Sequence, residues 1–190
     1  MKTFITLGIV LKISEDTIYQ LEHVLDLIET YQEEITIMHP DEGDYNHWEE
    51  ETILGKDIYQ LIDKLAYRNA FAKIIMDVNG KAVLMNLQTR NEDDQILIEL
   101  EFDQNILESS YGNIEAIDTF LQAFVTLFAQ SLDYEYIYAD HEADYLYSAT
   151  RIKELEYVPY SLLKMPSRNL TFAEWYPDKM TLRPNTDQDA

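Results

Sequence analysis

The apolar positions follow two spacings along the chain, and each spacing predicts a different kind of element. Residues 4–11 are almost continuously apolar, which is typical of a central strand covered on both faces. Gly8 inside that run indicates a bulge or a close approach of another group to the backbone. Apolar residues alternate with polar ones in 96–103 and in 134–139, which indicates two half-buried strands. Further strands are expected at 34–39, 71–78, 81–87, 160–165 and 170–175.

Other segments show the three-and-four spacing of amphipathic helices. One runs from about 18 to 31 and has an acidic outer face, and a second covers about 57–67. The longest spans about 114–132 and follows Asn113, whose side chain can cap a helix. Its apolar residues cover most of the circumference, so we expect it to be the most buried helix. A short helix is expected near 148–155.

Turn signals separate these elements and favour a single α+β domain. Asn79-Gly80 lies between two β-rich runs and favours a hairpin, because both residues tolerate positive φ. Pro40 ends one strand and opens a polar, acidic loop. We predict one domain over 1–184, with a mixed, mostly antiparallel sheet packed against about three main helices, and a frayed tail over 185–190.

Negative charge is concentrated in two blocks of the sequence. The chain carries 36 acidic and 14 basic residues, which give a net charge of -22. No Lys or Arg lies between Lys12 and Lys56 or between Arg90 and Arg151, and these two blocks hold 27 of the acids. Such a field weakens the compact state, but it attracts a basic partner and repels nucleic acid and anionic membrane. We therefore expect a basic protein partner, no nucleic-acid or membrane partner, and a monomer when free.

The residues that could carry catalysis or bind a metal form no established motif. The chain has no cysteine, which excludes disulfides and thiolate metal sites and fits a cytoplasmic protein. It has no Gly-x-Ser-x-Gly motif and no apolar run long enough to span a membrane. The spacing of His39, His47 and His141 among neighbouring acids matches neither HExxH nor an EF-hand loop. We predict no enzyme activity, no cofactor and no metal. A metal-dependent enzyme that uses these histidines stays open as an alternative.

Two segments combine carboxylates with aromatic rings, the composition of a binding hot spot for a basic partner. The rings supply contact area and the acids pair with Lys or Arg. In the alternative interpretation the acids are solvated and the rings belong to the core. The candidates in the first segment are Asp41, Glu42, Asp44, Tyr45, Trp48, Glu49, Glu50 and Glu51. The candidates in the second segment are Glu135, Tyr138, Asp140, Glu142, Asp144 and Tyr145.

Four segments together carry a family resemblance. These segments are 4–10, the acidic segment around Trp48, 136–145 and 160–163. They resemble bacterial polymorphic-toxin immunity proteins, in particular the immunity family numbered sixty-four, and the resemblance runs from Phe4 to about Pro166. It implies a cytoplasmic, non-enzymatic inhibitor that binds a cognate toxin, often encoded beside it. It assigns no role to an individual residue.

The resemblance and the charge together favour an antitoxin whose acidic, aromatic surface fills the basic active site of a toxin such as a nuclease. A second hypothesis keeps the binding role and changes the partner. An acidic DNA-mimicking regulator would inhibit several unrelated DNA-binding proteins, whereas an immunity protein acts on its cognate toxin alone. The neighbourhood of the gene separates the two hypotheses.

Overall fold

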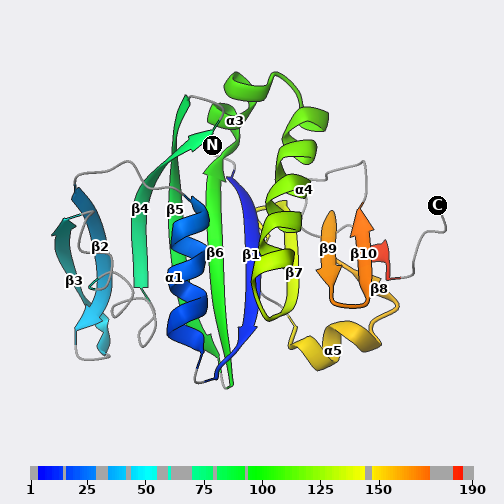
Figure 1. Ribbon diagram of the computed structural model, residues 1–190, viewed down its shortest axis with the longest axis horizontal. Helices are drawn as coiled ribbons and strands as arrows, with labels where there is room; N and C mark the ends of the chain where they lie inside the picture. The colour runs from blue at the N-terminus through cyan, green and yellow to red at the C-terminus, as the bar shows by residue number, and fades with distance from the viewer. Residues whose placement is uncertain are drawn as a thin grey trace. The chain divides into compact units, whose positions relative to one another are not determined.

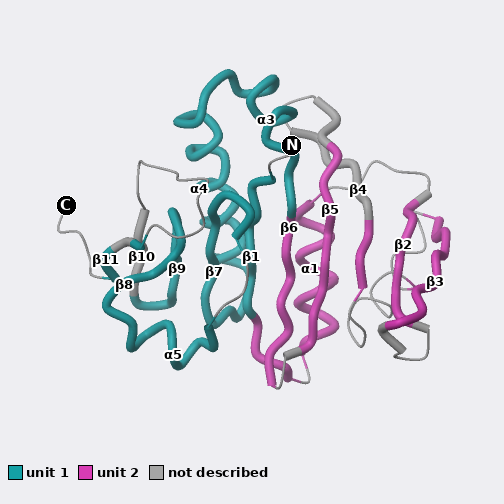
Figure 2. The backbone as a smooth tube through the Cα atoms, turned by 180° about the vertical axis from the view of Figure 1, so that it is seen from behind, with its two compact units in different colours: residues 1–10, 101–190 teal, residues 11–100 magenta. Residues whose placement is uncertain are grey.

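The structure is a computed structural model that combines strands and helices (Figure 1). It describes residues 4–14, 16–28, 34–41, 44–54, 60, 70–78, 81–92, 94–143, 147–171 and 182–185. The predicted α+β class is confirmed, because the described residues form strands β1 to β11 and helices α1, α3, α4 and α5. The chain divides into unit 1, residues 1–10 and 101–190, and unit 2, residues 11–100 (Figure 2). That 1–184 form one domain stays a prediction.

Unit 2 is built mainly from antiparallel strands. The strands are β2 (Glu34–Asp41), β3 (Asp44–Leu54), β4 (Ala70–Val78), β5 (Lys81–Glu92) and β6 (Gln95–Asp103), whose last three residues belong to unit 1. Their order is β6-β5-β4-β2-β3. β2 is antiparallel to β3 and β4, and β4 is antiparallel to β5. The pairing of Val78 with Lys81 confirms the predicted hairpin, although its turn residues lie outside the described part of the chain.

One helix in unit 2 follows the predicted amphipathic pattern. α1 (Thr17–Ile28) buries Leu21, Val24, Leu25 and Ile28 at the spacing of a single helix face. The hydroxyl of Thr17 accepts a hydrogen bond from the backbone N–H of Ser14 at 2.8 Å and fixes the entry to the helix. The helix predicted over 57–67 falls almost wholly outside the described residues.

Unit 1 holds the remaining strands and three helices. The strands are β1 (Phe4–Lys12, whose last two residues belong to unit 2), β7 (Tyr134–His141), β8 (Tyr157–Val158), β9 (Leu162–Met165), β10 (Arg168–Thr171) and β11 (Arg183–Pro184). Four of them follow the order β10-β9-β7-β1, and β8 pairs with β11 separately. Both faces of β1 are buried, as its continuous apolar run predicts. The helices are α3 (Gln104–Tyr111), α4 (Ile114–Ser131) and α5 (Ala149–Glu154).

The long helix α4 begins where the sequence predicts. The side chain of Asn113 accepts a hydrogen bond from the backbone N–H of Ala116 at 2.9 Å and caps the first turn. The prediction that this is the most buried helix is wrong. α4 buries four of its 18 residues, whereas α1 buries six of its 12. Phe120 and Phe124 lie on the flank of the buried face, and their rings contact each other at a tilt of 52°, with centroids 4.9 Å apart.

The segment near the C-terminus departs from the predicted frayed tail at its first residue. Asn185 is 4% exposed. Its amide nitrogen donates to the backbone oxygens of Ile152 and Leu155, each at 2.8 Å, and its backbone N–H donates to Glu156 at 2.7 Å. These bonds satisfy carbonyls at the end of α5, so Asn185 anchors the segment. Residues 186–190 lie outside the described part.

The half-buried Tyr111 ring should make the folded protein less stable in alkali. It stacks on Phe120 at 4.9 Å, and burial raises its pKa from 10.0 to about 12. The unfolded chain therefore loses the hydroxyl proton of this tyrosine near pH 10, while the folded chain keeps it. The contribution of the protonated hydroxyl to the free energy of unfolding is complete below pH 10 and is lost as the pH rises towards 12. We expect Tyr111→Phe to lose less melting temperature than the wild type between pH 9 and 11. The exposed Tyr19→Phe is the control, and equal losses in all three proteins would contradict the expectation.

Candidate functional site

The first acidic segment forms a hairpin rather than the predicted loop. β2 continues to Asp41 and returns through β3, with Pro40 opposite Trp48 and a register shift after Pro40. Polar residues predict a loop because they are depleted in strands, but a strand at the end of the order can keep them in water. Among the described strands, β3 pairs with β2 alone, so it is an edge strand of unit 2.

Strand alternation divides the acidic cluster between two faces. Successive side chains of a strand point to opposite faces, so Trp48 and Glu50 share one face while Glu49 and Glu51 share the other. Trp48 is 45% exposed, and Glu49 and Glu50 are also exposed. Leu54, 43% exposed, lies on the same face as Trp48. The cluster therefore offers a ring and a carboxylate on one face, with a further exposed carboxylate on the other.

His39 connects the second face of β3 to the core of unit 2. It is 2% exposed and pairs in register with Glu49. Its Nε2 atom lies 3.6 Å from a carboxylate oxygen of Glu51, and its Nδ1 atom lies 3.3 Å from the backbone oxygen of Pro40. Among the described residues, no three His, Asp or Glu side chains gather as a metal site would require. His39 therefore has a structural role, as a buried side chain that contacts the edge strand.

Part of the first segment has a described backbone only. Asp41, Asp44 and Tyr45 lie in the strands of the hairpin, but their side chains are outside the described part of the structure. Glu42 lies wholly outside it, as do Asp144 and Tyr145 of the second segment. Their assignment to a binding surface stays a prediction.

The second segment is largely core, and this corrects the prediction that it forms an accessible surface. Tyr138 is fully buried in β7 and stacks on Tyr160, with ring centroids 4.5 Å apart. Asp140 is 4% exposed and accepts a hydrogen bond from the backbone N–H of His141 at 2.7 Å. A partner cannot reach either side chain in this conformation. The alternative interpretation of the rings, as core residues, holds for this strand.

The other two described candidates of this segment lie partly in water and have local partners. A carboxylate oxygen of Glu135 is 3.9 Å from the ammonium nitrogen of Lys153. The backbone N–H of Glu142 donates to the backbone oxygen of Phe4 at 2.8 Å, which joins the end of β7 to the start of β1. Glu142 also adopts positive φ, 42°, as the chain turns out of β7. The Glu135 side chain and the Glu142 backbone therefore have structural roles beside the tyrosine layer, which is formed by Tyr136, Tyr138 and Tyr160.

Other acids of the second block also have structural roles. Glu99 is 5% exposed and its carboxylate lies 3.1 Å from the guanidinium of Arg90. Asp103 caps α3 by accepting from the backbone N–H of Asn105 at 3.0 Å. Together with Asp140, they show that the block contributes folding interactions as well as charge. Of the candidates in the two segments, those on β3 therefore keep an accessible combination of carboxylates and an aromatic ring, whereas those on β7 do not.

The buried tyrosines of β7 give a stability prediction. The Tyr136 hydroxyl donates to the backbone oxygen of Tyr147 at 2.5 Å, and the Tyr136 ring is fully buried. Tyr136→Phe should lower the free energy of unfolding by about 1–2 kcal/mol, because the carbonyl loses its partner. Urea denaturation measures this change. The exposed Tyr157→Phe should change stability by less than about 0.5 kcal/mol. A loss of similar size in both variants would show that the bond contributes nothing specific.

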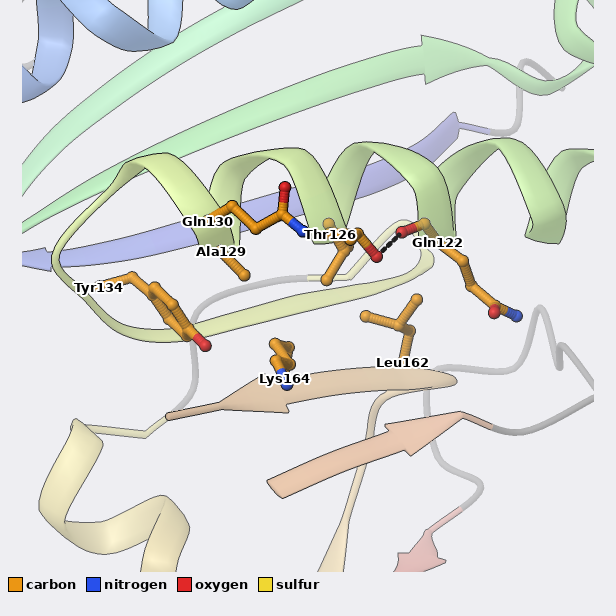
Figure 3. Close-up of a pocket in the computed structure, with 8 residues that line it drawn as sticks. Gln122, Thr126, Ala129, Gln130, Tyr134, Leu162 and Lys164 are labelled. Atoms are coloured by element: carbon orange, nitrogen blue, oxygen red, sulfur yellow. Dashed lines mark hydrogen bonds between the residues drawn. The ribbon is translucent and has the colours of Figure 1, made fainter. Parts of the chain in front are cut away.

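A pocket in unit 1 was not foreseen from the sequence. It has a volume of about 280 Å³ and lies between α4 and strands β7 and β9 (Figure 3). Its lining residues are Gln122, Val125, Thr126, Ala129, Gln130, Tyr134, Leu162 and Lys164. The lining residues of α4 recur at helical spacing, but this spacing predicts a helix face packed against other residues, not a pocket. Only the arrangement of α4 against β9 makes the pocket visible.

Comparison with known proteins adds a distant structural similarity. No family model matches the chain, and no curated protein matches it. Among solved structures, the Pseudomonas aeruginosa T6SS protein PA0821 is similar over 73% of this chain, with 14% identity and a TM-score of 0.36. The similar region spans 40% of that protein's chain. A similarity of this degree establishes neither a family nor an activity, so membership of the immunity family numbered sixty-four stays a prediction. In the described part, no helix is both long and apolar enough to cross a membrane.

Proposed function

We propose that this chain is a cytoplasmic immunity protein that binds and inhibits a cognate toxin with a basic active site. The observation that carries the proposal is an edge strand, β3, on which an exposed Trp48 shares one face with the exposed Glu50, while the exposed Glu49 lies on the other face. We place the contact on β3 rather than on β7, because the rings of Tyr136 and Tyr138 in β7 are fully buried. The proposal assigns the protein a binding role and no catalysis.

The backbone of β3 supports this proposal. An edge strand presents N–H and C=O groups along one side, and an incoming segment can pair with them. Charged side chains on such an edge discourage pairing between identical copies, since like charges meet. The same charges favour a basic segment. An acidic edge thus suits a protein that stays monomeric when free and pairs with a cationic partner.

The net charge supports fast association. A field from a charge of -22 draws a basic cleft towards the protein before contact. Steering of this kind can raise association rates to roughly 10⁸–10⁹ M⁻¹s⁻¹ at low salt, and it weakens steeply as salt is added. A lethal enzyme must be captured quickly, so the speed matches the proposed role. On contact, the Trp48 ring supplies the apolar area that charge alone cannot.

The proposal is tested with the product of the gene adjacent to this one. Bacteria that express that product should survive when the full chain is co-expressed, and the purified chain should abolish its activity at a ratio near one to one. Cell death at the same rate with and without the chain would contradict the proposal. Inhibition of unrelated DNA-binding proteins to the same extent would contradict it as well, and would favour the DNA-mimicking regulator.

A further inference from the structure

The pocket of unit 1 has one helix face as its wall. Gln122, Val125, Thr126, Ala129 and Gln130 follow i, i+3, i+4, i+7 and i+8 spacing, so all five lie on one side of α4. The small side chain of Ala129 leaves space where a longer one would reach across. Figure 3 shows β9 on the other side of that space, with the side chains of Leu162 and Lys164. Lys164 pairs in register with Ile137 of β7.

Two of the polar lining groups already have hydrogen-bond partners. The Gln122 amide nitrogen donates to the Asp118 carboxylate at 2.5 Å. The Thr126 hydroxyl donates to the backbone oxygen of Gln122 at 2.8 Å (Figure 3). Figure 3 also shows the Gln122 amide directed away from Tyr134 and Lys164. These two residues therefore contribute shape rather than spare donors.

Three lining donors remain for a ligand. They are the Gln130 amide, the Tyr134 hydroxyl and the Lys164 ammonium group, and none bonds to another residue in the part of the chain that the structure describes. Burial raises the pKa of Tyr134 above 10.0, so its hydroxyl keeps its proton at neutral pH and can donate. Val125, Ala129 and Leu162 supply an apolar floor between these donors.

The charge of the lining is opposite to that of the chain. Acids outnumber bases 36 to 14 in the sequence, yet none of the eight lining residues is acidic and the single charged one is Lys164. Ligand sites are typically apolar with a few convergent polar groups, and this pocket lies just below their usual range of roughly 300–1,000 Å³. An ammonium group with two neutral donors above an apolar floor suits an anionic head on a small apolar body.

We propose that this pocket binds a small carboxylate, whose oxygens accept from Lys164, Tyr134 and Gln130 and whose apolar body rests on Val125, Ala129 and Leu162. The site is separate from β3 and does not depend on the proposed inhibition of a toxin. Its ligand class follows from the positive charge of Lys164 and from the absence of any acidic side chain in the lining. The methyl groups of the floor report occupancy directly.

The test is a methyl NMR titration of the full chain with benzoate, and with benzamide as its neutral counterpart. At about 0.15 M salt the electrostatic field of the chain is screened beyond roughly 8 Å, so the residues that line the pocket determine the affinity for an anion. Benzoate should shift the methyl signals of Val125, Ala129 and Leu162 to saturation, and benzamide should bind at least about tenfold more weakly. Equal binding of the two, or shifts that never saturate, would overturn the proposal.

Three variants test whether the pocket is the site at which benzoate binds. Lys164→Met should weaken benzoate binding about tenfold or more, because it removes the charged donor. Lys153→Met removes the same charge from α5, outside the lining, and should change affinity less than about twofold. Ala129→Leu should abolish binding by filling the floor. If Lys164→Met and Lys153→Met have equal affinity for benzoate, Lys164 does not hold the ligand and the proposal is wrong.

Discussion

Replacing Gly8 with alanine should destabilise the protein by about 3 kcal/mol, because the added methyl group has no room in the core. A Cβ atom at Gly8 would lie 2.1 Å from Cζ and 2.2 Å from Cε1 of Tyr138. Tyr138 cannot easily move, because its ring is fully buried and stacks on Tyr160. The new methyl group must therefore displace β1 or the tyrosine layer. Chemical denaturation of Gly8→Ala against the wild type measures the loss.

Gly112 provides a matched control for this substitution. It ends α3 with φ 91°, and a Cβ atom there would have no neighbour within 4 Å. Gly112→Ala should cost only the conformational penalty of about 1–2 kcal/mol for a left-handed residue. Adding Tyr138→Leu to Gly8→Ala should cost less than the sum of the two single changes, because they share one contact. Strict additivity, or equal losses for the two glycines, would show that the ring does not press on Gly8.

Reversing two charges on β3 should slow association with the proposed toxin partner by about tenfold or more at low salt. Glu49→Lys with Glu50→Lys places a positive charge on each face of the edge strand that we propose as the contact. A basic cleft would then meet repulsion where it met attraction. Stopped-flow measurement of the association rate over a range of salt concentrations should also show a flatter salt dependence than the wild type. Trp48→Ala should act mainly on dissociation, because it removes contact area rather than charge.

A second double charge reversal separates the effect of the contact surface from the effect of the net charge. Asp26→Lys with Glu156→Lys changes two exposed acids far from β3 in the sequence. Both double variants carry -18 instead of -22, because each reversal adds two positive charges. The control should therefore lose only the small, general part of the steering. If the two double variants associate at the same rate, the edge strand is not the contact.

Local signals predicted several elements correctly. Asn113 caps α4, and the Asn79-Gly80 signal matches the β4–β5 hairpin. The unusual Gly8 in an apolar strand correctly indicated a close approach, because a residue without Cβ is needed where another group meets the backbone. These features depend on neighbouring residues or on a single backbone position, and such information is present in the sequence.

The wrong predictions concern features that depend on tertiary contacts. The composition around Trp48 is that of a loop, and only pairing with β2 turns it into an edge strand. The alternation in 134–139 identified a strand, but it could not show that Tyr160 and Gly8 cover the ring of Tyr138. The pocket beside Lys164 likewise depends on how α4 lies against β9. Contacts between segments distant in sequence leave no local pattern.

Hydrogen–deuterium exchange of the full chain, alone and with the product of the adjacent gene, shows whether the proposed partner covers β3. We expect the backbone amides of β3, Asp44–Leu54, to exchange at least about tenfold more slowly in the complex, because the partner would cover the edge strand. The amides of β7, Tyr134–His141, should exchange at the same rate in both states. A complex in which β3 exchanges as fast as in the free chain would contradict the account, as would the failure of any complex to form.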